Sequence, residues 1–360
     1  MLLAVCLVYG RLFFAGFVRF DDDLHVYANP FLNPPTLHSL ERLWQHAYEH
    51  LYVPLAYTIY AVLASLAQVA VHVDASIGQS ISVTALPFHV ASVALHALNV
   101  WLCFCLVRRL TDRPRVPWLC ALVFALHPLQ LESVAWISEL RGVSSASLVL
   151  LALNVFVSSR QAQNSPRRAG LLAVAAVSLL AATLCKPSAA AVPLVALAID
   201  RVALRTPWRK ALLAASVLAL VVVPFVMLTR ASQVIPAAGQ SSPWQRPFVA
   251  GDALAFYVLK TVLPIDLGVD YGRTPASVMA HGWSYLVWLL PGSLLAVAFV
   301  NRQRRPLTWL GLLMFVCFLL PTSGLMPFSF QAYSTVADRY AYLALLGVGL
   351  VVADVIDQVK

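Results

Sequence analysis

Long apolar runs separated by short polar gaps make up most of the chain. A helix that crosses a bilayer needs about 20 mostly apolar residues, and somewhat fewer where neighbouring helices bury it. Ten runs approach this length, at residues 1–18, 87–107, 116–129, 143–158, 169–185, 187–200, 211–229, 283–300, 306–321 and 339–356. The pattern therefore predicts a single all-α domain over residues 1–360, a polytopic membrane helix bundle with about ten spans.

Four of the gaps between these runs carry clustered basic residues, namely Arg108/Arg109/Arg113/Arg115, Arg160/Arg167/Arg168, Arg201/Arg205/Arg209/Lys210 and Arg302/Arg304/Arg305. Short loops rich in Lys and Arg stay in the cytoplasm. With all four clusters there, the ten spans alternate correctly. The extracytoplasmic side then receives residues 19–86, 129–142, the corner at Lys186, 230–283 and 321–338.

Two further apolar segments, residues 51–73 and 250–263, would each reverse this orientation if they crossed the bilayer. We interpret both as interfacial or re-entrant helices on the outer side, the first of them inside the extracytoplasmic loop 19–86. Residues 51–73 are long enough to span, so an ordinary transmembrane helix is the alternative. The run 1–18 lacks the basic start of a signal peptide, which favours a retained span over a cleaved leader.

The composition excludes a soluble domain, because no water-soluble fold of 360 residues hides a chain that is 60% hydrophobic and 11% charged. The formal net charge of +9 lies in the loop clusters, which is typical of membrane orientation and not of nucleic-acid binding. All six cysteines lie in apolar stretches, which indicates neither a disulfide framework nor a metal knuckle. The Ala-, Val-, Leu- and Arg-rich usage favours a bacterial inner membrane.

Three adjacent carboxylates, Asp21, Asp22 and Asp23, follow the first apolar run. Mutual repulsion and desolvation at a membrane surface raise the pKa of at least one of them. Such a group suits a general base or a grip on a sugar hydroxyl, and the cluster could also hold a divalent cation. A helix N-cap is the alternative for a lone aspartate, but three in a row followed by Asn29 favour a functional role.

The second outer loop carries Glu132 and Glu139, whose spacing of seven places them on one face of a continuous helix. His127 precedes Glu132 by five residues across a proline. One His and one Glu are too few for a zinc site, so no metal is assigned here. A proline-broken helix end whose polar residues meet water is the alternative to a functional interpretation.

Cations accompany these acids at the same face of the membrane. Lys186 lies in a tight apolar hairpin, where it either snorkels to the interface or binds an anion. Arg339 stands at the mouth of the last run, where it either forks onto a phosphate or pairs with Asp338. Acids beside cations at this depth suit a reaction on a phosphate-linked lipid. Transport is less favoured, because most runs lack ionisable residues at their centres.

Seven segments occur in one order along the chain: FDDDLHVYANP, YVPLAYTIYAVL, FHVASVALHALNVWL, LHPLQLESVAWISELRG, CKPSAAAVPLVALAID, LPIDLGVDYG and ADRYAYLALLGVG. In this ordered set the chain resembles the membrane half of the transmembrane and tetratricopeptide-repeat-containing O-mannosyltransferases and their bacterial relatives. These belong to the GT-C superfamily of polyprenyl-phosphate-sugar glycosyltransferases. No tetratricopeptide region follows residue 360, so we expect either that such a region was lost or that the acceptor is selected without repeats.

The resemblance implies a membrane glycosyltransferase that moves a sugar, expected to be mannose, from a polyprenyl-phosphate donor to a hydroxyl acceptor. The expected acceptor is a protein Ser or Thr; a cell-envelope glycan or lipid is the alternative, and a non-catalytic or transport protein is another. The resemblance assigns catalytic roles to Asp21, Asp22 and Glu132, donor-phosphate contacts to Arg339, Lys186 and Arg141, and supporting places to Asp23, His127, Asn29 and Asp338. It also matches a histidine pair, His89 and His96, for which polar packing between helices is the preferred interpretation.

Overall fold

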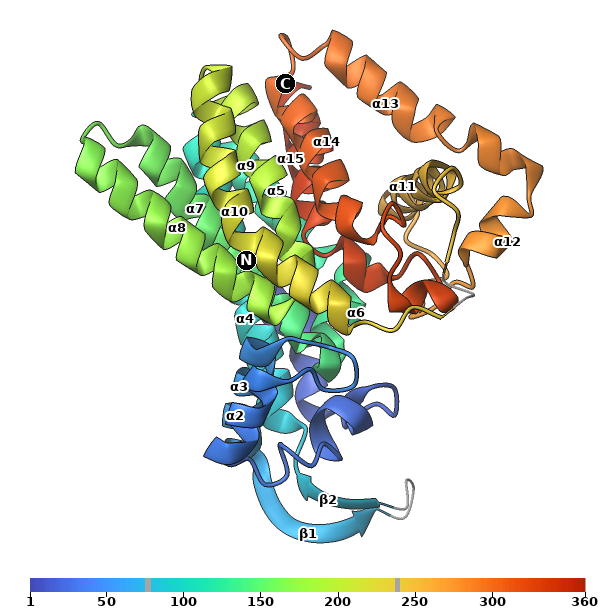
Figure 1. Cartoon of the computed structure of the whole chain (residues 1–360). Helices are drawn as coiled ribbons and strands as arrows, with labels where there is room; N and C mark the ends of the chain where they lie inside the picture. Colours follow the sequence, from blue (N-terminus) through green and yellow to red (C-terminus); the bar gives the residue numbers. More distant parts are fainter. Residues whose placement is uncertain (75–78, 237–239, 360) are drawn as a thin grey trace.

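A computed structural model describes residues 1–74, 79–236 and 240–359 (Figure 1). In chain order the α-helices are α1 (Leu2–Tyr9), α2 (Leu37–Gln45), α3 (Pro54–Ala67), α4 (Leu86–Leu110), α5 (Arg115–Leu126), α6 (Leu131–Ala135), α7 (Leu140–Gln161), α8 (Ser165–Cys185), α9 (Val192–Ala198), α10 (Trp208–Ser232), α11 (Arg246–Val262), α12 (Pro275–Met279), α13 (Leu289–Val300), α14 (Pro306–Leu319) and α15 (Ala344–Gln358). The strands are β1 (Gln68–Asp74) and β2 (Gln79–Val83). Short 3-10 or π turns occupy Gly10–Phe14 (η1), Asp23–Tyr27 (η2), Pro128–Gln130 (η3), Ile137–Glu139 (η4), Pro187–Ala191 (η5), Ile199–Ala203 (η6), Gly282–Leu286 (η8), Leu320–Thr322 (η9), Ser329–Ala332 (η10) and Asp338–Ala341 (η11).

Within the described residues, five helices are long and apolar enough to cross a bilayer: Leu86–Leu110, Ile137–Gln161, Ser165–Cys185, Trp208–Ser232 and Gly282–Val300. A sixth span results if α5 and the segment Pro128–Ala135, bent by 56° at the proline, count as one. The chain is therefore an integral membrane protein. The remaining predicted runs form shorter or broken helices, so the helix lengths support five or six spans and leave the expected ten unconfirmed.

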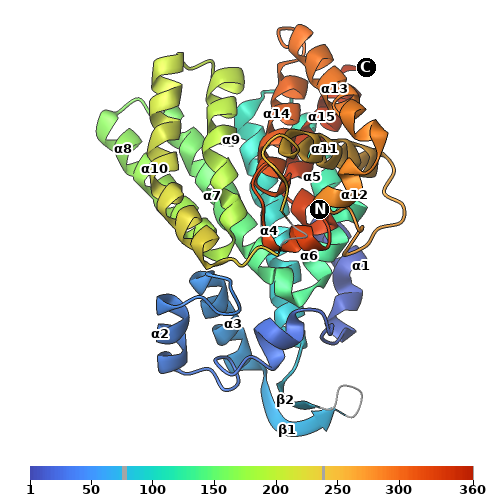
Figure 2. The same ribbon diagram turned by 45° about the vertical axis from the view of Figure 1, so that its right-hand side comes forward.

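The helices differ in how deeply they lie in the bundle (Figures 1 and 2). In the span Ile137–Gln161, which contains α7, 72% of the apolar 18-residue stretch is buried inside the protein. The corresponding share is 28% in α10 and 22% in the span Gly282–Val300, which contains α13. Apolar side chains such as Phe124 of α5 and Phe156 of α7 fill the centre. α7 is therefore a central helix, and the apolar outer faces of α10 and α13 are left to face lipid.

Glycines bring α14 and α15 into backbone contact. A Cβ added at Gly347 would lie 2.3 Å from the Gly311 carbonyl oxygen, and one added at Gly311 would lie 2.6 Å from the Gly347 carbonyl oxygen. Small residues at such crossings allow the close packing that associates helices in membranes. The glycine pair therefore sets a short distance between α14, which precedes the last outer loop, and α15, which follows it.

We expect Gly347→Ala to lower the free energy of unfolding in detergent by about 1–3 kcal/mol, because the backbone has to shift to admit the methyl group. Gly170→Ala is the matched control, since Gly170 lies within α8 and a Cβ there meets no atom within 4 Å. Thermal unfolding of both variants measures the difference. Equal stability of the two variants would contradict the close crossing of α14 and α15.

The first outer loop folds into a small unit beneath the bundle, made of η2, α2, α3 and the hairpin (Figure 2). The predicted helix over residues 51–73 is wrong for residues 68–73: α3 ends at Ala67, and the chain continues as β1, antiparallel to β2. The valine-rich sequence QVAVHV favours a strand there. At 14 residues α3 is shorter than a full span. Apart from this hairpin the described chain is helical, as predicted.

The basic clusters meet at one end of the bundle, which we call the basic end. There the Nη1 of Arg109 donates to Ser158 at 2.9 Å, and Arg160 pairs with Asp200 at 3.0 Å. Arg113 pairs with Asp354 near the end of α15. The loops at the opposite end, which we call the site end, hold every acid and cation assigned to a function by the sequence.

Figure 1 looks along the axis of α11, which lies across the bundle and not along it.

Candidate functional site

A cavity of about 840 Å³ opens at the site end of the bundle. Its inner polar side chains come from four separate segments of the chain: Asp21, His25, Glu139, Arg141, Lys186 and Arg339. Its other wall is apolar and comes from α9, α10 and the loop after α14, with Leu194, Val226, Leu320, Leu325 and Met326. The cavity therefore has a charged side and an apolar side.

The adjacent aspartates have different surroundings. Asp21 has a φ of 67°, a left-handed backbone that aspartate adopts more readily than most residues. Asp21 lines the cavity, whereas Asp22 is fully buried behind it. Asp23 opens the turn η2 and does not line the cavity. Asp21 is thus the member of the triplet that is placed to meet a ligand.

Asp22 fastens the first outer loop to the second. Its Oδ1 accepts hydrogen bonds from the backbone N of Ser138 at 2.8 Å and from the Ser138 hydroxyl at 2.6 Å. Its Oδ2 accepts from the backbone N of Val18 at 2.9 Å. The role that this geometry gives Asp22 is to position η4. Asn29 likewise has a local task, since its Oδ1 accepts from the backbone N of Phe31 at 2.9 Å.

The environment of Asp21 changes its acidity. Burial raises the pKa of Asp21 above the ordinary value for aspartate, and the positive charges of Arg141 and Arg339 oppose that rise in part. His25, also in the cavity, shares a 2.9 Å hydrogen bond between its Nδ1 and the Tyr57 hydroxyl. Burial and the nearby Arg141 lower the pKa of His25 to about 3, so this histidine is neutral at physiological pH.

Glu139 is the acidic centre of the cation cluster. Its Oε2 lies 2.6 Å from the Lys186 Nζ, and its Oε1 lies 3.6 Å from the Arg141 Nε. Gly142 leaves room for this pair, because a Cβ there would lie 2.5 Å from the Glu139 Oε2 and 3.0 Å from the Lys186 Nζ. Burial lowers the pKa of Lys186, and the Glu139 carboxylate opposes that change. Lys186 thus binds the Glu139 carboxylate and also lines the cavity.

Arg339 is held by the second acid, Glu132. The Glu132 carboxylate accepts from the backbone N and from the Nη1 of Arg339, each at 2.6 Å. The guanidinium also lies 4.3 Å from the ring centroid of Phe330 and 4.9 Å from that of Tyr340. These contacts aim a nearly buried cation at the cavity. The predicted alternative of an Arg339–Asp338 pair is wrong in this structure, since Asp338 instead accepts from the Tyr271 hydroxyl at 2.7 Å.

Two predictions about the second loop need correction. Glu132 and Glu139 do not share a helical face, because α6 ends at Ala135 and Trp136 is extended before η4 begins. Glu132 therefore holds Arg339 and does not line the cavity, while Glu139 does. His127 is also outside the cavity lining, and its Nε2 lies 3.1 Å from the carbonyl oxygen of Thr261 in α11.

The two histidines of α4 pack between helices, as preferred from the sequence. The Nδ1 of His96 lies 2.8 Å from the Tyr342 hydroxyl, and its Nε2 lies 3.1 Å from the Ala125 carbonyl oxygen. His89 is buried with its Nε2 3.4 Å from the Gly16 carbonyl oxygen. Neither histidine lines the cavity. Their polar contacts instead join α4 to the segment after η1, to α5 and to the segment just before α15.

Three polar residues next to the cations of the cavity, Glu139, His25 and Tyr340, were not assigned to the site from the sequence. Glu139 was noted for its spacing alone, although it binds two of the three cations. His25 and Tyr340 also line the cavity, and they lie inside the segments FDDDLHVYANP and ADRYAYLALLGVG. The SELRG segment places an acid two residues before Arg141, and this spacing is the signal that could have identified Glu139.

The aspartate triplet does not form a cluster of metal ligands. In the part of the chain that the structure describes, no three His, Cys, Asp or Glu side chains gather as they would around a metal ion. Asp22 is bound to Ser138, while Asp21 faces the cavity. A divalent cation held by Asp21–Asp23 together would require Asp22 to give up these hydrogen bonds.

Comparisons with known proteins identify no relative of the chain. No protein-family model, no curated protein and no solved structure gives a significant match to the chain. The site itself brings a partly buried aspartate, three cations and an apolar wall together in one cavity.

Proposed function

We propose that the chain is a polyprenyl-phosphate-sugar-dependent glycosyltransferase of the GT-C type. It takes a sugar, mannose in the first instance, from a polyprenyl-phosphate donor and passes it to a hydroxyl acceptor. The observation that carries the proposal is the single cavity in which Asp21 faces Arg141, Lys186 and Arg339 beside an apolar wall. A transporter would instead place such groups in broken helices near the middle of the bilayer.

The charges of the pocket suit a phosphodiester. Three cations, Arg141, Lys186 and Arg339, contact two carboxylates, Glu132 and Glu139. The Asp21 carboxylate balances the third positive charge until it takes up the proton of the acceptor, and one positive charge then faces the leaving phosphate. A sugar linked to a lipid through one phosphate carries one negative charge. The exposed rim holds Glu49 and Arg230, whose opposite charges offset each other. A guanidinium held in place in advance is the group best suited to bind two phosphate oxygens.

The apolar wall suits the polyprenyl chain. Leu194 of α9 and Val226 of α10 lie on helices whose outer faces are exposed and hydrophobic, so the cavity opens toward lipid. A donor approaching from the bilayer would keep its hydrocarbon against this wall while its phosphate reaches the cations. The sugar would then lie between the phosphate and Asp21. This arrangement needs no nucleotide-binding loop.

The reaction follows from these positions. Asp21, as a carboxylate, accepts the proton of the acceptor hydroxyl, whose oxygen attacks the anomeric carbon. The bond between that carbon and the phosphate oxygen breaks, and the lipid phosphate leaves with the electron pair. Arg141, Lys186 and Arg339 stabilise the charge that develops on it. Attack opposite the leaving group inverts the configuration of the sugar carbon.

The sidedness of the membrane sets the compartment. The arginine clusters meet at the basic end, and the positive-inside rule supports a cytoplasmic location for that end and an extracytoplasmic one for the cavity. The proposed location is a bacterial inner membrane, and the proposed acceptor is a Ser or Thr of an exported protein. A glycan or lipid acceptor of the cell envelope is the alternative, since the acceptor side of the cavity contains no motif that identifies its substrate.

Transfer of radiolabelled mannose from polyprenyl-phosphate-mannose tests this function. We expect membranes containing the chain to move label into a protein fraction, and membranes without it to show background. Label in the glycan or lipid fraction would support the alternative acceptor. A panel of other lipid-linked sugars is assayed in parallel. Background transfer from every donor by protein shown to be folded would overturn the proposal.

A further inference from the structure

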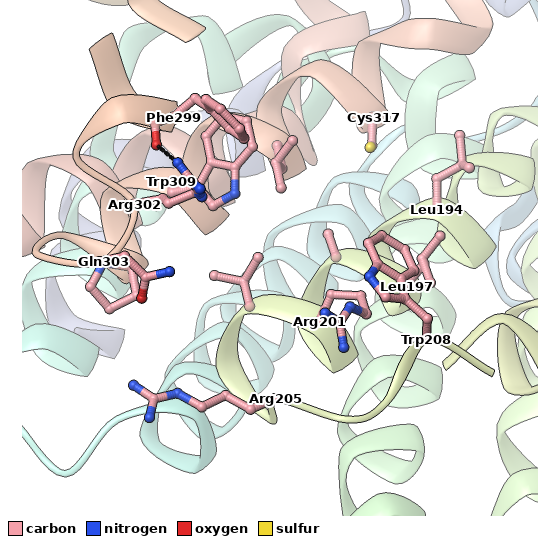
Figure 3. A pocket seen from close by; sticks show the side chains of 14 residues that line it. Leu194, Leu197, Arg201, Arg205, Trp208, Phe299, Arg302, Gln303, Trp309 and Cys317 are labelled. Atoms are coloured by element: carbon pink, nitrogen blue, oxygen red, sulfur yellow. Dashed lines mark hydrogen bonds between the residues drawn. The ribbon is translucent and has the colours of Figure 1, made fainter. Parts of the chain in front are cut away.

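A second cavity, of about 710 Å³, opens at the basic end of the bundle (Figure 3). One side is formed by the end of α9, by η6 and by the start of α10, and the other by the α13–α14 corner. Figure 3 shows Arg201 and Trp208 on one side and Arg302 and Trp309 on the other, with open space between them. The proposed transferase reaction does not use this cavity.

The cavity gathers arginines that have no acidic partner. Arg201, Arg205 and Arg302 line it, and of the described residues that line it none is acidic. None of the three belongs to an ion pair within the described chain, whereas Arg113 and Arg160 at the same end are paired with aspartates. Positive charge is therefore left free at this cavity and neutralised elsewhere on the basic end.

The Arg201 side chain supplies a second, independent observation. Its Nε is buried and has no hydrogen-bond partner in the described structure, although its Nη1 donates to the Thr206 carbonyl oxygen. Its guanidinium lies 4.3 Å from the ring centroid of Trp208. A donor without a partner leaves this guanidinium with unused hydrogen-bonding capacity for an anionic ligand. The stacked tryptophan holds the guanidinium in place for such a ligand.

The walls below the arginines are apolar and follow helical spacing. On α9, Leu197 and Leu194 lie four and seven residues before Arg201, and on α14, Leu313 and Cys317 lie four and eight residues after Trp309. At 1.5 Å per residue these rows run about 10–12 Å from the arginines along the helices toward the middle of the bundle. Hydrocarbon, and not a free ion, fits a groove of this depth.

We propose that this cavity binds an anionic phospholipid of the surrounding bilayer, with its phosphate on Arg201 and Arg302 and its acyl chains between α9 and α14. Basic pockets between transmembrane helices hold acidic head groups in this way, and interfacial tryptophans mark the head-group level. The lipid would join α9 and η6 to the α13–α14 corner. The same α9 supplies Leu194 to both cavities.

Native mass spectrometry of the full chain in detergent tests the site, with dioleoyl phosphatidylglycerol and dioleoyl phosphatidylcholine as probes. We expect one phosphatidylglycerol to be retained and phosphatidylcholine to be lost. Arg201→Gln with Arg302→Gln should weaken retention roughly 25-fold, at about fivefold for each charge. The matched control is Arg209→Gln with Arg304→Gln, which removes the same charge from exposed neighbours that do not line the cavity. That control should retain the lipid.

Other outcomes would overturn the proposal. Equal retention of both lipids would show that the head-group charge is not recognised, and equal loss in both double variants would indicate a diffuse surface charge. Displacement of phosphatidylglycerol by millimolar inorganic phosphate would indicate a site for a free anion. If the Arg201→Gln pair fails to fold, Arg302→Gln alone serves, since that guanidinium contacts its own helix end through Phe299. It should weaken retention about fivefold, and unchanged retention would contradict the site. Each result is independent of sugar transfer.

Discussion

Asp21→Asn is expected to lower the rate of sugar transfer by about 10²–10⁴-fold while the protein remains folded, because a general base contributes that much to a proton transfer. Asparagine has nearly the same shape and tolerates the left-handed backbone that Asp21 adopts, so the change removes the basic oxygen and little else. The measurement is the turnover of purified variant and wild type with the same labelled lipid donor, alongside their thermal unfolding.

Asp23→Asn is the matched control for this change. It removes the same charge two residues further along, at a position that does not line the cavity. Its turnover should stay within about threefold of wild type, since it alters a screened charge near the site and touches no reacting atom. If Asp23→Asn and Asp21→Asn lose turnover equally, the effect is one of overall loop charge, and Asp21 is not the base.

The pH dependence provides a second readout of the same assignment. A general base works as a carboxylate, so turnover rises with pH through its pKa and then levels off. Burial raises the pKa of Asp21, so the acid limb of the profile should lie above pH 3.9, about where an ordinary aspartate titrates. The residual activity of Asp21→Asn should lack this limb. An unchanged limb in that variant would assign the titration to another group.

The predictable part of the molecule is what local pattern and charge determine. Apolar runs of α4, α7, α8 and α10 are continuous and long, so the hydropathy alone places them. The arginine clusters predicted on one side do meet at one end, through pairs such as Arg160–Asp200. The predicted topology also places Asp21 and Arg339 on the same side of the membrane, because Asp21 follows the first run and Arg339 begins the last one. Both residues line one cavity.

The parts that sequence reasoning missed depend on contacts between distant segments. Residues 132–139 carry the spacing of one helix, yet the chain is extended at Trp136, whose Nε1 donates to the Phe20 carbonyl oxygen at 2.9 Å. Asp22 then binds Ser138 across 116 residues of sequence. Neither contact is visible in a local pattern. As a result Glu139, and not the expected Glu132, lines the cavity, while Glu132 holds Arg339. The helix predicted beyond Ala67 is wrong for a different reason, since an apolar valine-rich run fits a strand as well as a helix.

Asp22→Ala is expected to lower the free energy of unfolding by about 3 kcal/mol or more. The change leaves the backbone N of Ser138, its hydroxyl and the backbone N of Val18 without their acceptor in a buried place. Asp22→Asn should cost less, because its amide oxygen still accepts from Ser138 while its amide nitrogen opposes the Val18 donor. Ser138→Ala, which removes one of the three hydrogen bonds, should cost about 1 kcal/mol. Chemical or thermal unfolding in detergent ranks the three variants.

Any loss of turnover in an Asp22 variant should result from its loss of stability. Ser138 lies next to Glu139, so releasing it frees the acid that holds Lys186 and Arg141. Turnover of Asp22→Asn should therefore recover toward wild type when the assay is cooled below its unfolding transition, whereas Asp21→Asn should stay inactive at every temperature. The two neighbours would then separate, one changing the chemical step at constant stability and the other changing stability first. A temperature-independent loss in Asp22→Asn would instead place Asp22 among the reacting groups, and its burial behind Asp21 would have to be relieved when the donor binds.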